Sequence, residues 1–196
     1  MKQTIKAKEV VAIARAAQGI AIVDVDGTLF QTDRCLHAAE KKKYGRILRR
    51  DEFDALLRSK QREILLSGYS KSIDFATPNI PVVNAVESCR RRGYKIAILT
   101  GRHLEIEDGT IRLFRKHNVR YDEMHHNPFT IIRASAFKVL TVAELVKGYN
   151  KVIVYDNDEK HVSNITELLK HRLTMDQSFI VYKVRKDGTI VQYARG

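Results

Sequence analysis

The chain has 196 residues, of which 44% are hydrophobic and 30% are charged. This length fits one domain, and this hydrophobic content is enough to bury a core, which argues against a disordered chain. The formal net charge of +12 favours polyanionic partners such as nucleic acid. A well-solvated basic surface, or a basic pocket for a small phosphate ester, would explain the same charge.

The chain carries no signal for a membrane or for export. No apolar run approaches the roughly 18 residues of a membrane span, and the N-terminal residues lack the continuous apolar segment of a secretory signal. Cys35 and Cys89 stand far apart and in no motif, so we expect neither a disulfide framework nor a zinc site. We therefore expect a cytoplasmic protein without membrane contact. Nothing in the pattern indicates an oligomeric state.

The first third of the chain predicts helices around one buried strand. Residues 4–18 have apolar positions at helical spacing before Gly19, and residues 20–25 form the apolar, β-branched run of a strand buried on both faces. Residues 34–70 are polar with apolar residues at helical spacing, which predicts two or three helices. Pro78 and Pro81 mark the return to the main body.

The rest of the chain alternates between the two periodicities. The expected elements are a helix at 80–93, a strand at 94–99, a helix at 104–117, a short strand at 121–126, a helix at 135–148, a strand at 151–155 and a helix at 159–171. Residues 178–194 predict a β-hairpin around Asp187-Gly188. This alternation predicts an α/β fold, with a doubly wound, mainly parallel, Rossmann-like sheet. Residues 1–196 are expected to form a single domain.

Polar groups follow three of the expected strands. Asp24 and Asp26 follow the first, Thr100 in "ILTGR" follows the second, and Asp156 and Asp158 in "VYDND" follow the third. Folds of this kind bind ligands beyond the carboxyl ends of their strands, so these groups are expected to converge. Several carboxylates together repel one another unless a cation is bound, and hard oxygen ligands suit Mg²⁺.

A calcium loop or a simple turn would also place acids close together. A calcium loop that opens with D-x-D needs Gly at its sixth position and Glu at its twelfth. Counted from Asp24 the sixth residue is Leu29, and counted from Asp156 it is His161, although Glu167 lies at the twelfth. Turn formation and helix capping would explain one Asp at this place but not two.

Four motifs together resemble the haloacid dehalogenase-like (HAD) superfamily. "DVDGTL" at 24–29 is similar to its first motif, "ILTGR" at 98–102 to its second, Phe137-Lys138 to its third and "VYDND" to its fourth. They occur in the order of the family, over roughly residues 20–165. The first motif is specific, and the other three are short.

The resemblance implies a role for each catalytic residue. Asp24 would attack phosphorus and form an aspartyl-phosphate, and Asp26 would protonate the leaving oxygen and then activate water. Thr100 would hydrogen-bond the phosphoryl group, and Lys138 would neutralise the nucleophile and the developing charge. Each has a plainer alternative, because Thr often caps helices and most Lys residues lie on surfaces.

The resemblance also implies ligands for metal and substrate. Mg²⁺ would be bound by Asp24, by the main-chain carbonyl of Asp26 and directly by Asp156, with Asp158 acting through water. Many family members have two adjacent acids in the fourth motif, whereas Asn157 separates the two acids here. Gly101 and Arg102 would contact the substrate, with the Arg102 guanidinium holding a phosphate.

The insertion at residues 31–77 lies where many HAD phosphatases carry a helical cap. Its run "KKKYGRILRR" at 41–50 is either a solvated helix face or a platform for a polyphosphate backbone. The "TGR" triplet and the His five residues after Asp156 are similar to RNA-repair-type HAD domains and, more loosely, to polynucleotide phosphatase domains. In that resemblance His161 would orient an acid of the fourth motif. His125 and His126 point to opposite faces of a strand, so we interpret them as structural.

The sequence thus predicts a Mg²⁺-dependent phosphomonoesterase that acts on nucleic-acid ends or nucleotides. Two alternatives stay open. One is a phosphatase of a small phosphorylated metabolite, and the other is a basic nucleic-acid-binding module with little turnover.

Overall fold

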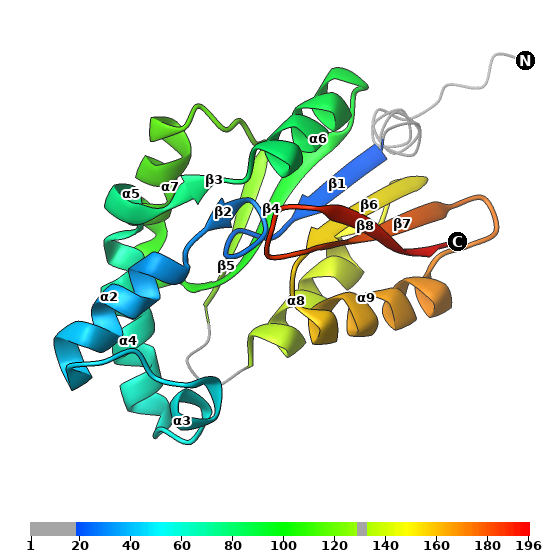
Figure 1. The fold of residues 1–196 in the computed structure, drawn as a ribbon. Coiled ribbons are helices and arrows are strands. Elements are labelled where there is room, and N and C mark those ends of the chain that lie inside the picture. Colours follow the sequence, from blue (N-terminus) through cyan, green and yellow to red (C-terminus); the bar gives the residue numbers. More distant parts are fainter. Residues whose placement is uncertain (1–18, 129–132) are drawn as a thin grey trace, which may run out of the picture.

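A six-stranded sheet forms the centre of the protein in a computed structural model that describes residues 19–128 and 133–196 (Figure 1). The strand order is β5-β4-β1-β6-β7-β8, and every neighbouring pair is parallel except β7 and β8. The bounds are β1 Gly19–Val23, β4 Lys95–His103, β5 Glu123–Asn127, β6 Lys151–Asp156, β7 Ser178–Val184 and β8 Ile190–Arg195. The predicted α/β fold with a mainly parallel sheet is confirmed.

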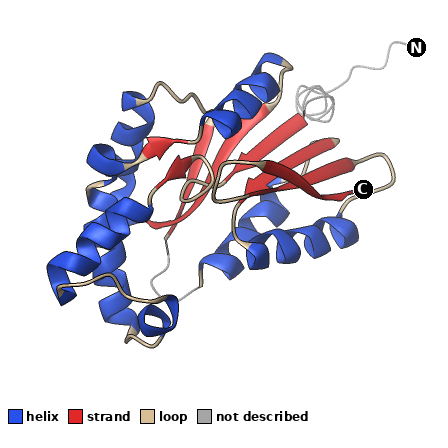
Figure 2. Cartoon of the chain, viewed as in Figure 1, coloured by secondary structure: helices blue, strands red, loops and turns tan. Residues whose placement is uncertain are grey.

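Helices cover both faces of this sheet (Figure 2). In β1, Ala21 and Val23 pack into a cluster with residues of α6 (Ile80–Arg91) and α7 (Glu107–Lys116). Ile20 and Ile22 pack into a second cluster with residues of α8 (Ala134–Leu145) and α9 (Glu159–Arg172). Because side chains alternate along a strand, an unbroken apolar run serves both faces. The doubly wound arrangement follows from that run.

Several boundaries differ from those expected. The helix expected from 104 begins with a 3-10 turn, η1 (Leu104–Ile106), and α8 ends three residues early at Leu145. The strand expected to end at Leu99 runs on to His103, because His103 still pairs with Asn127 of β5 after a register shift. Thr100, Gly101 and Arg102 therefore lie within β4. The helix expected at 4–18 lies outside the described residues, and Gly19, expected to end it, begins β1.

The insertion contains four helices, where the sequence predicted two or three. They are α2 Asp33–Tyr44, α3 Arg50–Asp54, α4 Arg58–Ser70 and α5 Ser72–Phe75. The short strands β2 (Phe30–Gln31) and β3 (Thr77–Pro78) pair antiparallel at its base, so the chain leaves and returns at one place. In Figure 1 these helices form a group beside the sheet, at the side where β1 ends.

The C-terminal hairpin is confirmed as β7 and β8, and it completes one edge of the sheet. Its turn contains Gly188 with φ of 88°, in the left-handed region that Gly adopts easily. The Asp187 carboxylate accepts a hydrogen bond from the Thr189 amide across this turn. Among the described residues, no helix is long and apolar enough to cross a membrane.

Candidate active site

The loop after β1 places Asp24 beside the neighbouring strand. The Asp24 amide donates to the carbonyl of Tyr155 in β6 over 3.0 Å, which continues the pairing of the two strands by one residue. The chain then turns sharply at Gly27, whose φ is 75° and whose amide donates to the Phe30 carbonyl. The Asp24 side chain is consequently buried at the carboxyl end of the sheet.

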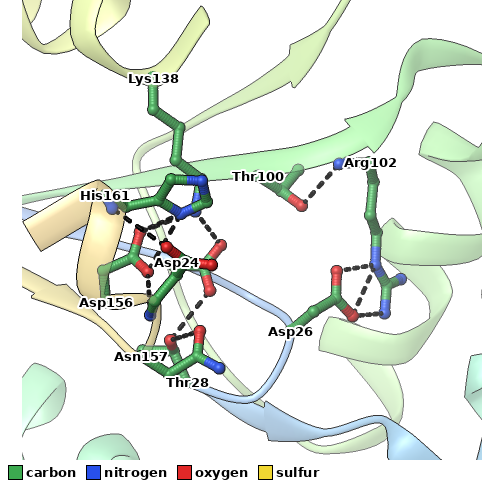
Figure 3. A network of polar contacts seen from close by, with 10 residues as sticks. Asp24, Asp26, Thr28, Thr100, Arg102, Lys138, Asp156, Asn157 and His161 are labelled. Carbon is green, nitrogen blue, oxygen red and sulfur yellow. Dashed lines mark hydrogen bonds and ion pairs between the residues drawn. The ribbon is translucent and has the colours of Figure 1, made fainter. Parts of the chain in front are cut away.

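Lys138 joins the first and fourth motifs. Its Nζ donates to Oδ1 of Asp24 and to Oδ2 of Asp156, each over 2.7 Å, and all three side chains are buried (Figure 3). Lys138 lies near the start of α8, where the helix dipole disfavours a cation. The two carboxylates compensate for that placement, so the structure brings together three of the residues that the motifs single out.

One ammonium group cannot neutralise two buried carboxylates. Burial raises the pKa of Asp24 to about 6, Lys138 opposes this rise, and the charges of Asp156 and Asp26 add to it. Burial also acts to raise the pKa of Asp156, but Lys138 and His161 outweigh it and lower that pKa to about 2. For Lys138, burial lowers the pKa and the two carboxylates outweigh it, so its pKa lies above the ordinary value. The group therefore holds one negative charge without a partner of its own.

Thr28 and Asn157 complete this group, although the motifs assigned neither of them a role. The Thr28 hydroxyl lies 2.9 Å from Oδ2 of Asp24 and 3.2 Å from Oδ1 of Asn157, with both oxygens placed to accept its proton. Thr28 thus orients the oxygen of Asp24 that Lys138 does not contact. Its position four residues after the acid, in a glycine turn, is a signal that the sequence did offer.

Asp26 belongs to a different group and binds Arg102. Nε and Nη2 of Arg102 both donate to the Asp26 carboxylate, at 2.8–3.2 Å, while Nη1 donates to the hydroxyls of Ser72 and Thr110, each at 3.1 Å. The guanidinium also lies over the Tyr69 ring, with 4.6 Å between its carbon and the ring centroid. The Arg102 side chain has no exposed surface. In this arrangement its donors serve the protein itself, whereas the sequence assigned them to a substrate phosphate.

The partners of Arg102 come from separate parts of the chain. Ser72 begins α5 and Tyr69 lies in α4, both within the insertion, while Thr110 lies in α7. The sequence carries no signal for any of these contacts, because they depend on how the insertion packs against the sheet.

Thr100 and Gly101 lie within β4, directly before Arg102, and Gly101 lines the cavity at Asp24. The Thr100 hydroxyl accepts a hydrogen bond from the Arg102 amide over 3.1 Å, and the residue is fully buried. A Cβ on Gly101 would lie 2.9 Å from Cβ of Ala134, so this Gly lets the start of α8 approach β4 closely. Their expected contacts with phosphate remain predictions.

The fourth motif divides its residues between two tasks. Asp158 caps α9, since its Oδ1 accepts from the amides of Lys160 at 2.9 Å and His161 at 3.1 Å. Nδ1 of His161 lies 3.2 Å from Nζ of Lys138 and 3.4 Å from Oδ1 of Asp156, so His161 stands beside the acid that it was expected to orient. Helix capping explains the position of the Asp158 carboxylate without a metal ion. Its expected contact with Mg²⁺ through a water molecule stays a prediction.

The site fits a hard divalent cation in its donor chemistry. Asp24 and Asp156 supply two carboxylates with an uncompensated negative charge, and Asn157 and the Asp26 carbonyl are neutral oxygens on the same turns. In the part of the chain that the structure describes, no three His, Cys, Asp or Glu side chains are grouped to hold one ion. Any ion here would therefore need neutral oxygens or water beside the two carboxylates.

The adjacent histidines of β5 make no hydrogen bond or ion pair with these groups among the described residues. His126 is buried, its Nδ1 is 3.8 Å from Oε1 of Glu107, and neither of its ring nitrogens has a hydrogen-bond partner among the described residues. Burial lowers its pKa to about 4, as do the charges of Arg102 and His125, while Asp26 opposes this effect. The folded protein thus holds a neutral imidazole, in keeping with the structural interpretation of this pair.

No family model matches this sequence, and no curated protein matches it. Solved structures do match the fold. A chain of the Pnkp1/Rnl/Hen1 RNA repair complex is 18% identical with a TM-score of 0.56, and the match covers 86% of this chain but only 43% of that one. The present chain therefore spans less than half of that protein.

Two further matches cover most of both chains. The putative beta-phosphoglucomutase of Thermotoga maritima is 15% identical with a TM-score of 0.56, over 79% of this chain and 83% of that one. The HAD domain of the Legionella pneumophila effector Lem4 is 17% identical with a TM-score of 0.53, over 86% and 87%. The chain therefore has the fold of haloacid dehalogenase-like hydrolases, as its motifs predicted.

We expect Lys138→Met to destabilise the protein strongly. The substitution leaves Asp24 and Asp156 buried side by side without their cation, and removing one partner of a buried ion pair costs about 3–5 kcal/mol. The control is Lys147→Met, because Lys147 pairs with Glu144 on the surface of the protein. Urea unfolding measures both variants. Equal, small shifts in midpoint would contradict the central role of Lys138.

We expect part of the acid sensitivity of the protein to come from His126. Its pKa is about 4 in the folded protein and 6.5 ordinarily, so the unfolded chain binds the extra proton first. The contribution of His126 to the free energy of unfolding is complete above pH 6.5 and is lost as the pH falls toward 4. His126→Gln should flatten the curve of unfolding free energy against pH across this window. His171→Gln, on the exposed end of α9, should leave it unchanged, and the same slope in all three proteins would refute the prediction.

Proposed function

We propose that the protein is a phosphomonoesterase in which Asp24 is the nucleophile. The observation that carries this proposal is the buried Lys138 held between Asp24 and Asp156 at the carboxyl end of the sheet. One Asp24 oxygen is held by Lys138 and the other by Thr28, so the carboxylate has a fixed direction. Attack on phosphorus would form an aspartyl-phosphate and release the alcohol, and water would then restore Asp24. Lys138 would offset the charge that develops.

Asp26 would donate the proton to the leaving oxygen and then take one from water. Its carboxylate is held by the Arg102 guanidinium, which is itself fixed by Ser72, Thr110 and Tyr69. We propose that Arg102 is a positioning residue for Asp26 and does not hold the substrate phosphate. Thr100 and Gly101 would contact the phosphoryl group from the floor of the site.

Mg²⁺ would be held by Asp24 and Asp156, with the main-chain carbonyl of Asp26, and with Asp158 acting through water. When bound it would supply positive charge that offsets the negative charges of the carboxylates and of the phosphate. The Asn157 amide oxygen lies 3.2 Å from the Thr28 hydroxyl, which also contacts Asp24, whereas the Asp158 carboxylate caps α9. The Asn157 oxygen would therefore be a further ligand for the same ion.

The substrate we favour is the phosphorylated end of a nucleic acid, or a nucleotide. Support comes from the net charge of +12 and from the likeness to a chain of an RNA repair complex. A small phosphorylated metabolite is the second candidate, because the cavity at Asp24 measures only about 290 Å³ and the insertion lines one side of it. A basic binding module with little turnover is the third.

A substrate comparison tests the proposed function. Phosphate release with Mg²⁺ is measured on 3′- and 5′-phosphorylated oligonucleotides, on nucleotides and on a panel of sugar phosphates, with Asp24→Asn as the control. We expect turnover of the oligonucleotides that Asp24→Asn abolishes and a metal chelator removes. Equal or better rates on sugar phosphates would favour the metabolite. Equal, near-zero rates for the wild type and Asp24→Asn on every ester would favour the third candidate, a binding module with little turnover.

We expect Arg102→Lys to lower kcat for a small ester by roughly 10- to 100-fold with little change in KM, because Lys keeps the charge but not the two-pronged hold on Asp26. The kcat–pH profile should change its shape as well, which a merely structural loss would not cause. The control is Arg90→Lys, since Arg90 makes a similar two-pronged pair with Glu87 on α6. A raised KM with unchanged kcat would instead assign Arg102 to the substrate phosphate.

A further inference from the structure

A second and larger cavity adjoins the catalytic one. It measures about 820 Å³, and we call it the cap–core groove. Its residues include Phe53, Arg58 and Leu65 on the insertion side and His103, Arg133 and Lys160 on the sheet side. In Figure 1 the insertion helices α3 and α4 face the starts of α8 and α9. Pockets of about 300–1,000 Å³ hold drug-sized ligands, so this groove has room for more than a phosphate group.

The two cavities share part of their lining. Leu65, Tyr69, Gly101, Arg102 and Ala134 line both of them. A molecule with a phosphate at Asp24 would therefore have its next groups at the mouth of the groove. The part of the substrate that is attached to that phosphate would therefore occupy the groove.

The described lining of the groove holds more basic than acidic side chains. Arg58, Arg133 and Lys160 are exposed, and none of them has an ion pair or hydrogen-bonded side-chain partner in the described contacts. Arg62 also lines it, paired with Glu105, and Asp54 is the one acid among the described residues of its lining. Arg133 and Lys160 stand at the N-terminal ends of α8 and α9, where the helix dipoles add to the attraction for anions.

The walls between these cations are apolar and partly aromatic. Phe53, Leu56, Leu66, Tyr69 and Ile106 line the groove beside the basic side chains. A charged channel with aromatic and apolar side chains is the usual combination for single-stranded nucleic acid, whose bases stack while its phosphates meet the cations.

The basic run at 41–50 is a separate surface. Within it Lys43 pairs with Glu63, Arg46 with Glu52 and Arg49 with Asp51. Lys41 and Lys42 are exposed in the last turn of α2, and neither lines the groove or the catalytic cavity. The insertion's own acids therefore neutralise much of the run that the sequence offered as a nucleic-acid platform.

We propose that the cap–core groove binds single-stranded nucleic acid, with the nucleotides next to the terminal phosphate lying along Arg58, Arg133 and Lys160. This inference rests on the proposed function and names the substrate path of that site. The run at 41–50 contributes only to the general positive field of the protein.

Two double variants with equal loss of charge test the path. Arg58→Ala/Lys160→Ala removes two groove cations, and Lys41→Ala/Lys42→Ala removes two outside it. Binding of a labelled single-stranded oligonucleotide without a terminal phosphate is measured by fluorescence anisotropy between about 0.05 and 0.2 M salt, for RNA and DNA separately. Each phosphate contact contributes about 0.7 to the slope of log K against log salt for single strands. The groove variant should therefore lower that slope by about 1.4 and weaken binding on the order of tenfold.

The variant at 41–42 should change the slope far less, and its turnover of p-nitrophenyl phosphate should equal that of the wild type. Equal losses in the two variants, or none in either, would overturn the proposal, as would the failure of both polymers to bind the wild type. Because binding is measured without turnover, the result stands apart from the proposed function. If the protein had no phosphatase activity but the groove variant alone lost binding, the proposed enzymatic function would be rejected and the proposed binding groove would be supported.

Discussion

The structure of the site depends on one buried cation between two carboxylates. Lys138 reaches from α8 to Asp24 after β1 and to Asp156 at the end of β6, and so ties two adjacent strands to the helix that covers them. A buried carboxylate without a partner is costly, and these two acids would repel each other without the ammonium group. The charge that remains after this pairing supports our proposals that Asp24 attacks phosphorus and that the site binds a metal ion.

A second buried cation, Arg102, binds Asp26, so the two acids of the first motif have different partners. Asp26 is only two residues from Asp24, yet it turns to Arg102, whose other contacts are Ser72 and Tyr69 of the insertion. The insertion is thus connected to Asp26, the acid that we propose to be catalytic, through the Arg102 guanidinium. If the insertion moves, the hold on Asp26 changes with it, so access to the site and the direction of the acid are linked by the same contacts.

Most of the fold was predictable because its signals are local. Apolar runs in β1, β4 and β6 predict strands buried on both faces, and the Asp187-Gly188 turn predicts the hairpin. The predictions failed where pairing or packing decides the outcome. β4 runs four residues past its apolar part because His103 still pairs with β5, and the insertion divides into four helices without apolar runs to mark each one.

The sequence by itself determined the α/β class and the acids at the strand ends, because a parallel sheet brings those ends to one edge whatever the loops do. It also singled out Lys138, which the structure places between Asp24 and Asp156. Only the tertiary structure decided that Arg102 faces Asp26, that Asp158 caps α9 and that Thr28 supports Asp24. Those partners depend on which side chains meet when the insertion and the helices pack against the sheet, and spacing along the chain does not encode that.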